Sequence, residues 1–505
     1  MKSERTGVKR VSKTKKRSGA WGAIATLHRD ALHVLWHRRV RSLAPGESDA
    51  AVRRRELTRA AMRNGASIGR ARVLSWFVGP KRRRRMREEA AQRASADLAR
   101  TMGEMKGLAM KFGQFYSFAG GLSKTAEQGL EHLQSAAPPM SFDVVQAVLE
   151  RELGARALKR FASFEQTPLA SASVGQVHRA TLPDGRQVVV KVQYPGIEEA
   201  ILADFDNIAL LTRAFGAMRV DFDMEAILAD LLKMMQEEFD YELEARNQTY
   251  FANRFSGHPF VKVPDVVPEL STRRVLTSEW IEGRKLSDVL AGEDAAERDR
   301  IAEIVYRFAF GSIRTGTFTT DPHPGNYLFM DDGRVCFLDF GFVKRLEEVG
   351  EIDQVLAPIL ATMRGDGEAL AVGLSDLGLV PDGRAARPER LWSELQPLYC
   401  GPVDRDEPVT LDSDAFNKAV RVAQRPTAEF YRCRKAAHQP VYVSMLLRYT
   451  MGTQAVLALL GATANWRRLA MEVLLDAEPR TDVGRRWNER ARAGETAATV
   501  MEGAS

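Results

Sequence analysis

The chain has 505 residues, 45% hydrophobic and 28% charged, which is typical of several folded domains and excludes a wholly disordered protein. Its three cysteines show no metal-ligand spacing and are too few for a disulfide framework, which favours a reducing, cytoplasmic compartment. The net charge of +7 is uneven, because residues 1–100 carry +19 and the remainder −12, and this indicates an anionic partner for the N-terminal part.

Residues 1–94 form a basic leader that we expect to be partly disordered. Within it, residues 20–43 predict an amphipathic helix that ends before Pro45-Gly46. This helix could lie in a membrane interface or pack on its own protein. The five consecutive cations Lys81–Arg85 indicate either a solvated loop or a contact to lipid headgroups or nucleic acid.

Two further features of the chain bear on its partners. The run Lys81–Arg85 contains no aromatic residue, which argues against single-stranded nucleic acid. No stretch reaches the ~18 apolar residues that a membrane-spanning helix needs, and the N-terminus does not read as a secretory signal.

Residues 95–160 predict a helical segment, and residues 161–283 a β-rich lobe. The lobe begins with a hairpin, because the apolar, β-branched runs Val177–Thr181 and Gln187–Val192 flank an Asp-Gly turn. A helix is expected at about 222–252, followed by strands at 261–267 and 274–281.

Residues 284–480 predict a helical lobe that contains one small hairpin, and residues 481–505 a polar tail. The hairpin joins Tyr327–Met330 to Val335–Leu338 through another Asp-Gly turn. A β-rich lobe followed by a helical lobe is the order of a bilobal kinase.

Lys191 is the first candidate for chemistry, since it lies inside the apolar strand Val188–Val192. A lysine there needs either an anionic partner or, at an edge strand, a route to solvent. Glu244 is the candidate partner. It lies on an acidic helical segment that could equally be a solvated face.

The segment Asp321-Pro-His-Pro-Gly-Asn326 is the strongest local signal. Asp321 and Asn326 have the D-x-x-x-x-N spacing of a kinase catalytic loop, although a capped surface turn is the simpler alternative. Thirteen residues past Asn326 comes Asp339-Phe-Gly, directly after the apolar strand. Asn326 and Asp339 offer the oxygen ligands that suit Mg²⁺.

The loop before the lysine strand lacks a G-x-G-x-x-G motif. Ala170-Ser171-Ala172-Ser173 stands there instead, and its small side chains, hydroxyls and amides still allow close approach to phosphate.

With these motifs in place, the sequence resembles the UbiB/aarF-domain (ABC1-type) family of atypical kinases over roughly residues 95–475. The marks of that family appear here as a K-x-G-Q motif at Lys111–Gln114, an alanine-rich loop at Ala170–Ser173 and a strand lysine at Lys191. They continue with an E-x-D motif at Glu238–Asp240, D-P-H-P-G-N at Asp321–Asn326 and D-F-G at Asp339–Gly341.

The resemblance implies an α+β, bilobal protein-kinase-like fold with an N-terminal helical extension over the active site. It also implies ATP and Mg²⁺ as cofactors, with the following roles. Lys191 contacts phosphate and pairs with Glu244, and Glu279 to Ile281 form the adenine hinge. Asn326 and Asp339 ligate metal, and Asp321 is the catalytic aspartate. Lys111 and Gln114 lie on the leader over the site, which Glu238 and Asp240 help to hold.

A leader over the site would occupy the place where a peptide binds. The resemblance therefore implies an ATPase, or a phosphotransferase for a lipid-like or small-molecule substrate, associated with isoprenoid-quinone biosynthesis and the inner face of a membrane. Two departures from the family pattern matter: Ser171 replaces a more usual alanine, which leaves nucleotide preference open, and C-terminal membrane spans of some relatives are absent.

Two other functions compete with the enzyme. One is a nucleotide-gated scaffold, and the other a conventional protein kinase, which the lack of an A-P-E motif after Gly341 disfavours. The acceptor and the oligomeric state are not indicated by the sequence.

Overall fold

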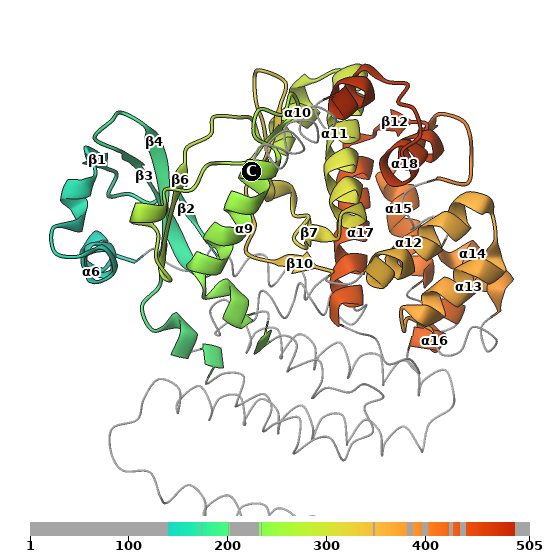
Figure 1. The fold of residues 1–505 in the computed structure, drawn as a ribbon, viewed down its shortest axis with the longest axis horizontal. Helices are drawn as coiled ribbons and strands as arrows, with labels where there is room; N and C mark the ends of the chain where they lie inside the picture. Colours follow the sequence, from blue (N-terminus) through green and yellow to red (C-terminus); the bar gives the residue numbers. More distant parts are fainter. Residues whose placement is uncertain are drawn as a thin grey trace, which may run out of the picture. The chain divides into compact units, whose positions relative to one another are not determined.

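The computed structural model describes part of the chain (Figure 1). The described residues are 140–172, 174–199, 201–202, 232–233, 235–346, 349–380, 387–395, 402–423, 428–434 and 441–489. The predicted leader helix at 20–43, the basic run Lys81–Arg85 and the Lys111–Gln114 motif lie outside these ranges.

A five-stranded antiparallel sheet forms the first part of the described fold (Figure 1). Its path runs β1-β3-β4-β6, with β2 also paired to β3. The predicted hairpin is confirmed, and Gly185 in its turn has φ +89°, a value that favours glycine. The strands are β1 Ser163–Phe164, β2 Ala170–Ser171, β3 Gly175–Thr181, β4 Gln187–Gln193 and β6 Val275–Glu279.

One face of this sheet is covered by helix α6, Phe142–Leu153. Val145 and Leu149 of the helix are fully buried together with Val188 and Val190 of β4. The helix and the sheet therefore share one hydrophobic core.

His178 of β3 lies fully buried in a hydrogen-bonded chain at the edge of that core. Its Nδ1 is 2.8 Å from the carbonyl oxygen of Glu165, so Nδ1 carries the proton and Nε2 accepts from the Gln176 amide at 2.9 Å. Burial lowers the pKa of His178, and the Glu165 carbonyl only partly offsets this. The folded protein therefore holds this histidine neutral.

We expect the free energy of unfolding to fall as the pH drops below about 6.5, the ordinary histidine pKa. In that range His178 binds a proton in the unfolded chain but stays neutral in the folded protein, so protonation favours the unfolded state. In urea titrations at pH 7.5, 6.5 and 5.5, His178→Asn should show a shallower pH slope than wild type. Equal slopes for the two proteins would contradict the prediction.

The predicted single helix at 222–252 is wrong in its described part. Helical residues end at Glu238, and a new helix, α9, spans Tyr241–Arg254. The break arises because Asp240 caps α9, its side chain accepting a hydrogen bond from the Leu243 amide at 2.9 Å.

The predicted small hairpin is confirmed as β8, Tyr327–Phe329, and β9, Val335–Phe337. A short strand β5, Val261–Lys262, adds to β9 in parallel, and β7, Thr317–Thr319, pairs with β10, Val343–Arg345. The strand expected at 261–267 is shorter than predicted. Pro264 has no N–H for a ladder, which limits strand length there.

Helices make up most of the rest, as predicted. Their bounds are α10 Leu286–Gly292, α11 Ala295–Arg314, α12 Val349–Arg364, α13 Gly367–Asp376, α14 Pro388–Leu395, α15 Ser413–Ala423, α16 Glu429–Arg434, α17 Val441–Leu460 and α18 Trp466–Leu475. The two-residue strands β11, Val409–Thr410, and β12, Thr463–Ala464, pair with each other.

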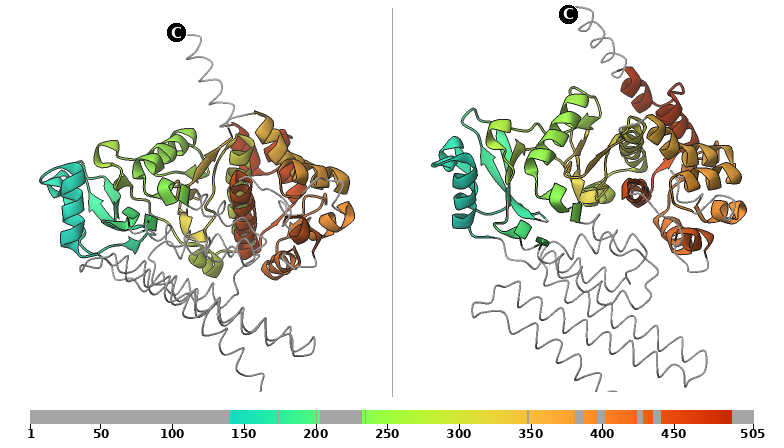
Figure 2. Two further views of the ribbon diagram at one scale, coloured as in Figure 1. Left: turned by 90° about the horizontal axis from the view of Figure 1, so that it is seen from below. Right: turned by 60° about the horizontal axis from the view of Figure 1, so that its bottom comes forward.

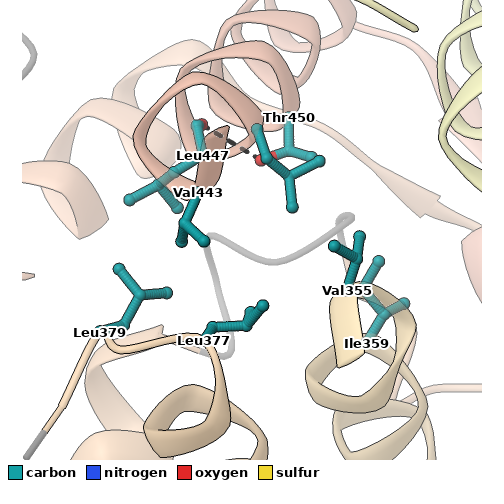
Figure 3. A pocket seen from close by; sticks show the side chains of 8 residues that line it. Val355, Ile359, Leu377, Leu379, Val443, Leu447 and Thr450 are labelled. Carbon is teal, nitrogen blue, oxygen red and sulfur yellow. Dashed lines mark hydrogen bonds between the residues drawn. The ribbon is translucent and has the colours of Figure 1, made fainter. Parts of the chain in front are cut away.

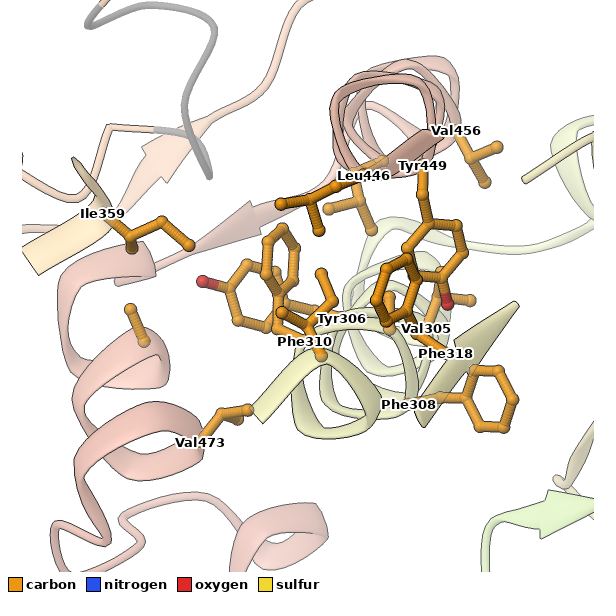
Figure 4. Packing of buried hydrophobic residues seen from close by; sticks show 14 of the residues in the cluster. Val305, Tyr306, Phe308, Phe310, Phe318, Ile359, Leu446, Tyr449, Val456 and Val473 are labelled. Carbon is orange, nitrogen blue, oxygen red and sulfur yellow. The ribbon is translucent and has the colours of Figure 1, made fainter. Parts of the chain in front are cut away.

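The core of this helical part is aromatic and centres on α11 (Figure 4). Tyr306 and Phe310 of α11 lie 4.3 Å apart between ring centroids, and Tyr306 lies 5.7 Å from Trp466 of α18. Figure 2 shows the same helices from two further directions. Residues 482–489 are also helical, and Trp487 packs against His258, so packed structure continues past residue 480.

None of the helices in the described ranges is both long and apolar enough to cross a membrane.

Candidate active site

Lys191 lies in the interior of the sheet. Strand β4 runs between β3 and β6, and Lys191 is opposite Val177 on one side and Leu276 on the other. The edge-strand alternative for this lysine is therefore wrong. Alternation in β4 buries Val190 and Val192 in the core and sends Lys191 to the opposite face.

Glu244 of α9 meets Lys191 on that face. The Lys191 Nζ atom lies 2.8 and 3.0 Å from the two carboxylate oxygens, and 4.7 Å from the centre of the Tyr241 ring. Burial lowers the pKa of Lys191, but attraction to Glu244, and then to Tyr241 and Asp339, outweighs burial and raises the pKa overall. Lys191 is thus held as a cation at neutral pH.

Burial of this ion pair mainly affects the Glu244 carboxylate. Its side chain is 7% exposed, and burial raises its pKa while Lys191 opposes the rise. The nearby Asp339 carboxylate adds to the increase. Lys191, Glu244 and Asp339 therefore form one electrostatic cluster with an excess of negative charge, which favours a further cation beside it.

Asp339 begins a tight turn at the end of β9. Its Oδ1 accepts from the Gly341 amide at 2.9 Å, and a Cβ at Gly341 would lie 3.3 Å from that oxygen. Phe340 is fully buried against Phe251 of α9, with 4.9 Å between ring centroids. Asn247 of α9 donates to the Phe340 carbonyl at 3.0 Å. The turn is thus fixed to the helix that carries Glu244.

Asp321 and Asn326 face each other across the loop between β7 and β8. The Asn326 Nδ2 atom donates to the Asp321 carboxylate at 3.2 Å, which leaves the amide oxygen of Asn326 directed elsewhere. Pro324 opens a short 3₁₀ turn, and the His323 ring accepts from the Gly325 amide at 3.0 Å. The loop is therefore held by its own hydrogen bonds.

The two motifs are joined by backbone hydrogen bonds. Leu338, just before Asp339, donates its amide to the Asn326 carbonyl at 3.0 Å, and Thr320 donates to the Phe342 carbonyl at 2.8 Å. Residues 321–326 and 339–341 therefore lie side by side.

One carboxylate and one amide oxygen are a fitting donor set for Mg²⁺ on a nucleotide, which also takes phosphate oxygens and water. Among the described residues no cluster of three or more His, Cys, Asp or Glu could hold a metal ion by itself. A cation at Asn326 and Asp339 would thus need a ligand such as a phosphate to complete its shell.

Ala170–Ala172 lie at the start of the connection from β2 to β3. Ala170 is opposite Val177, and the Ala172 amide donates to the Gly175 carbonyl at 2.8 Å, so this amide is already used. A Cβ at Gly175 would collide with the Val192 carbonyl, which explains the glycine. Ser173 lies outside the described residues, as do Lys111 and Gln114.

The predicted hinge follows β6. The Glu279 carboxylate lies 2.6 Å from Lys262 Nζ, so this side chain is occupied by a local ion pair. The Trp280 amide donates to the Gln187 carbonyl at 2.9 Å, and Ile281 is buried. The Ile281 amide is the next backbone donor along this segment.

Three residues of this region were missed from sequence. Tyr241 places its ring below Lys191, Asn247 holds the Phe340 carbonyl, and Arg448 of α17 donates to Asp321 at 3.1 Å. Arg448 alone had a signal in the sequence, because it is the single charge in the apolar run 441–460.

Comparisons with known proteins agree on one family. The model of the ABC1 atypical kinase-like domain matches residues 132–372. Atypical kinase COQ8, a mitochondrial protein of Saccharomyces cerevisiae, is 32% identical over 47% of this chain and 48% of its own length. The chloroplastic protein ACTIVITY OF BC1 COMPLEX KINASE 1 of Arabidopsis thaliana is 34% identical over 52% of this chain and 40% of its own.

A solved structure gives wider coverage. A Mycobacterium tuberculosis protein, determined in complex with erythromycin, is 30% identical and superposes with a TM-score of 0.58 over 78% of this chain and 98% of its own. By contrast, the chain spans about half the length of the curated relatives it matches.

Proposed function

Because this chain belongs to the ABC1 (UbiB/aarF-domain) family of atypical kinases, with an α+β protein-kinase-like fold, we propose that it is a Mg²⁺-dependent ATPase or phosphotransferase that supports isoprenoid-quinone or other lipid metabolism at a membrane surface. The observation that carries the proposal is the cluster of Lys191, Glu244 and Asp339, next to the Asp321–Asn326 loop.

Each side chain has a physical task in this mechanism. Lys191 would hold nucleotide phosphates, and Glu244 keeps the lysine charged and aimed. The Asn326 amide oxygen and the Asp339 carboxylate would hold Mg²⁺, and Asp321 would orient the attacking hydroxyl or water. Bound MgATP supplies the phosphoryl group that is transferred.

Adenine would be recognised along Glu279 to Ile281, and the Ala170–Ser173 loop would cover the phosphates. Lys111 and Gln114 are proposed to lie over the site. Since that position excludes a peptide, a lipid-like or small-molecule acceptor is the substrate class that we infer.

The test is ATP hydrolysis by the full chain, with and without vesicles that contain anionic lipid. We expect Mg²⁺-dependent hydrolysis, stimulated by the vesicles and absent from Asp339→Asn. Hydrolysis that does not exceed the Asp339→Asn level under either condition would reject the enzyme. Metabolite and lipid profiling of a deletion strain would then identify the pathway.

Membrane association is a separate prediction that depends on the basic leader. Replacing Lys81–Arg85 with five serines removes five positive charges, each worth about 1 kcal/mol near an anionic surface. We expect at least about a tenfold loss in sedimentation with anionic vesicles at low salt. Wild-type binding should also weaken at high salt, where the Debye length shrinks to a few ångströms. Salt-independent binding would contradict an electrostatic mechanism.

A nucleotide-gated scaffold is the second candidate, and the occluding position proposed for Lys111 and Gln114 favours it. Cells that carry Asp321→Ala would grow normally if ATP binding alone mattered, whereas cells with a Lys191 variant would not. A defect in both would favour catalysis.

A conventional protein kinase finds little support. The chain enters β10 at Val343 and α12 at Val349, soon after Gly341. This leaves no room for the long activation segment that shapes a peptide groove.

A further inference from the structure

Helix α17 lies beyond residues 132–372, to which the family model is matched, yet it contacts the catalytic loop. Arg448 is its single charged residue. The Arg448 guanidinium donates to the Asp321 Oδ1 atom at 3.1 Å. A lone arginine in an apolar helix must be paired or reach solvent, and here it is paired with the carboxylate that the motif singles out.

The pair is well shielded from solvent. The side chains of Arg448 and Asp321 are 13% and 12% exposed. Asn326 donates to the other oxygen, Oδ2, at 3.2 Å. Each carboxylate oxygen of Asp321 therefore has a donor from a different element, and the two donors together fix the plane of the carboxylate.

The same helix also supports the loop sterically. Gly452, one turn after Arg448, packs so closely on Pro322 that a Cβ there would collide with the proline ring. Tyr449 stacks on Phe318 of β7, with 5.9 Å between ring centroids and 24° between ring planes. Contacts at Phe318, Asp321 and Pro322 thus place α17 directly behind the loop.

An apolar pocket on the other side of α17 takes no part in this contact (Figure 3). Val443, Leu446, Leu447 and Thr450 line it at helical spacing, on the face opposite Arg448 and Gly452. The Thr450 hydroxyl is bonded to the Leu447 carbonyl, which leaves the pocket without a group to recognise phosphate.

We propose that Arg448 is a positioning residue for phosphoryl transfer, which acts by fixing the Asp321 carboxylate toward the acceptor. The inference rests on the proposed function and extends the site beyond the segment that the family model covers. Arg448 bonds to Asp321, whereas the proposed function assigns the nucleotide and the metal to Lys191, Asn326 and Asp339. Its loss should therefore lower turnover and leave nucleotide affinity in place.

The experiment compares four full-length variants with wild type. Arg448→Ala removes the donor, Arg448→Lys keeps a cation, and Gly452→Ala displaces Pro322 while Arg448 stays. Arg468→Ala is the matched control, because Arg468 forms an ion pair with Asp406 at 2.5 Å elsewhere in the helical part. For each variant we would measure kcat for ATP hydrolysis, the Kd of MgATP and the melting temperature.

We expect Arg448→Ala to lose about 10- to 100-fold in kcat, the cost of a misplaced catalytic group, with the Kd of MgATP within about threefold of wild type. Arg448→Lys should recover part of the loss, Gly452→Ala should lower kcat in the same way, and Arg468→Ala should match wild type.

Two outcomes would overturn the inference. One is a folded Arg448→Ala protein with wild-type kcat, and the other is a parallel loss of kcat and MgATP affinity, with equal effects of lysine and alanine. If wild type itself does not exceed Asp339→Asn, the proposed function fails instead, and the two failures are therefore distinct.

Discussion

Lys191→Met is expected to abolish detectable MgATP binding and to destabilise the fold by about 3 kcal/mol, the lower end of the cost of breaking a buried ion pair. Methionine fills a similar volume but leaves Glu244, 7% exposed, without the cation that is 2.8 Å away in wild type. An uncompensated buried carboxylate is costly, although its protonation limits the cost. Thermal or urea unfolding measures stability, and a fluorescent ATP analogue measures binding.

The double variant Lys191→Met/Glu244→Leu separates the two effects. Replacing a buried ion pair with apolar residues of similar size is often neutral for stability, so we expect most of the lost stability to return. Nucleotide binding should stay absent, because the phosphates still lack their cation. Wild-type MgATP affinity in the single variant would remove Lys191 from the proposed site.

The second large effect is expected for Asp339→Asn, which should lower the rate of Mg²⁺-dependent ATP hydrolysis about 10³-fold. A metal ion contributes several kcal/mol to transition-state stabilisation, and about 4 kcal/mol corresponds to this factor. Asparagine keeps an oxygen for the Gly341 amide, which is 2.9 Å away in wild type, so the turn should be preserved. The variant should therefore fold while it loses the charge that binds metal.

Stability gives an internal check on that interpretation. The Asp339 carboxylate contributes to the raised pKa of Glu244, so removing its charge should leave the melting temperature equal or slightly higher. Asp332→Asn is the matched control, because Asp332 lies in the neighbouring β8–β9 turn and bonds only locally to Arg334. Activity of Asp339→Asn within about threefold of wild type would show that this carboxylate does not hold the metal.

Local patterns predicted the local structure well. Both hairpins were located from apolar β-branched runs around Asp-Gly turns, because strand alternation and the positive φ of the turn glycine are properties of a few adjacent residues. The D-x-x-x-x-N loop was found for the same reason, since its two prolines restrict its backbone wherever it stands.

The wrong predictions share a cause. The helix expected at 222–252 breaks at Asp240, where a side-chain cap competes with helical continuation. The strand at 261–267 stops early because Pro264 has no N–H for a ladder and only Val261 and Lys262 of this segment pair with β9. In both cases the periodicity was present, but a specific hydrogen bond or a partner strand set the boundary.

The sequence by itself determined which residues are the candidates for the proposed chemistry: Lys191, Asp321, Asn326 and Asp339 are each marked by their immediate neighbours in the chain. Only the tertiary structure decided what surrounds them. It confirmed Glu244, the partner expected from the sequence, at Lys191 rather than on a solvated face, placed the Tyr241 ring beneath that lysine, and set Arg448 against Asp321, 127 residues away. Such contacts depend on how strands and helices pack, and no spacing along the chain encodes them, so the charge balance of the site became visible only in the folded protein.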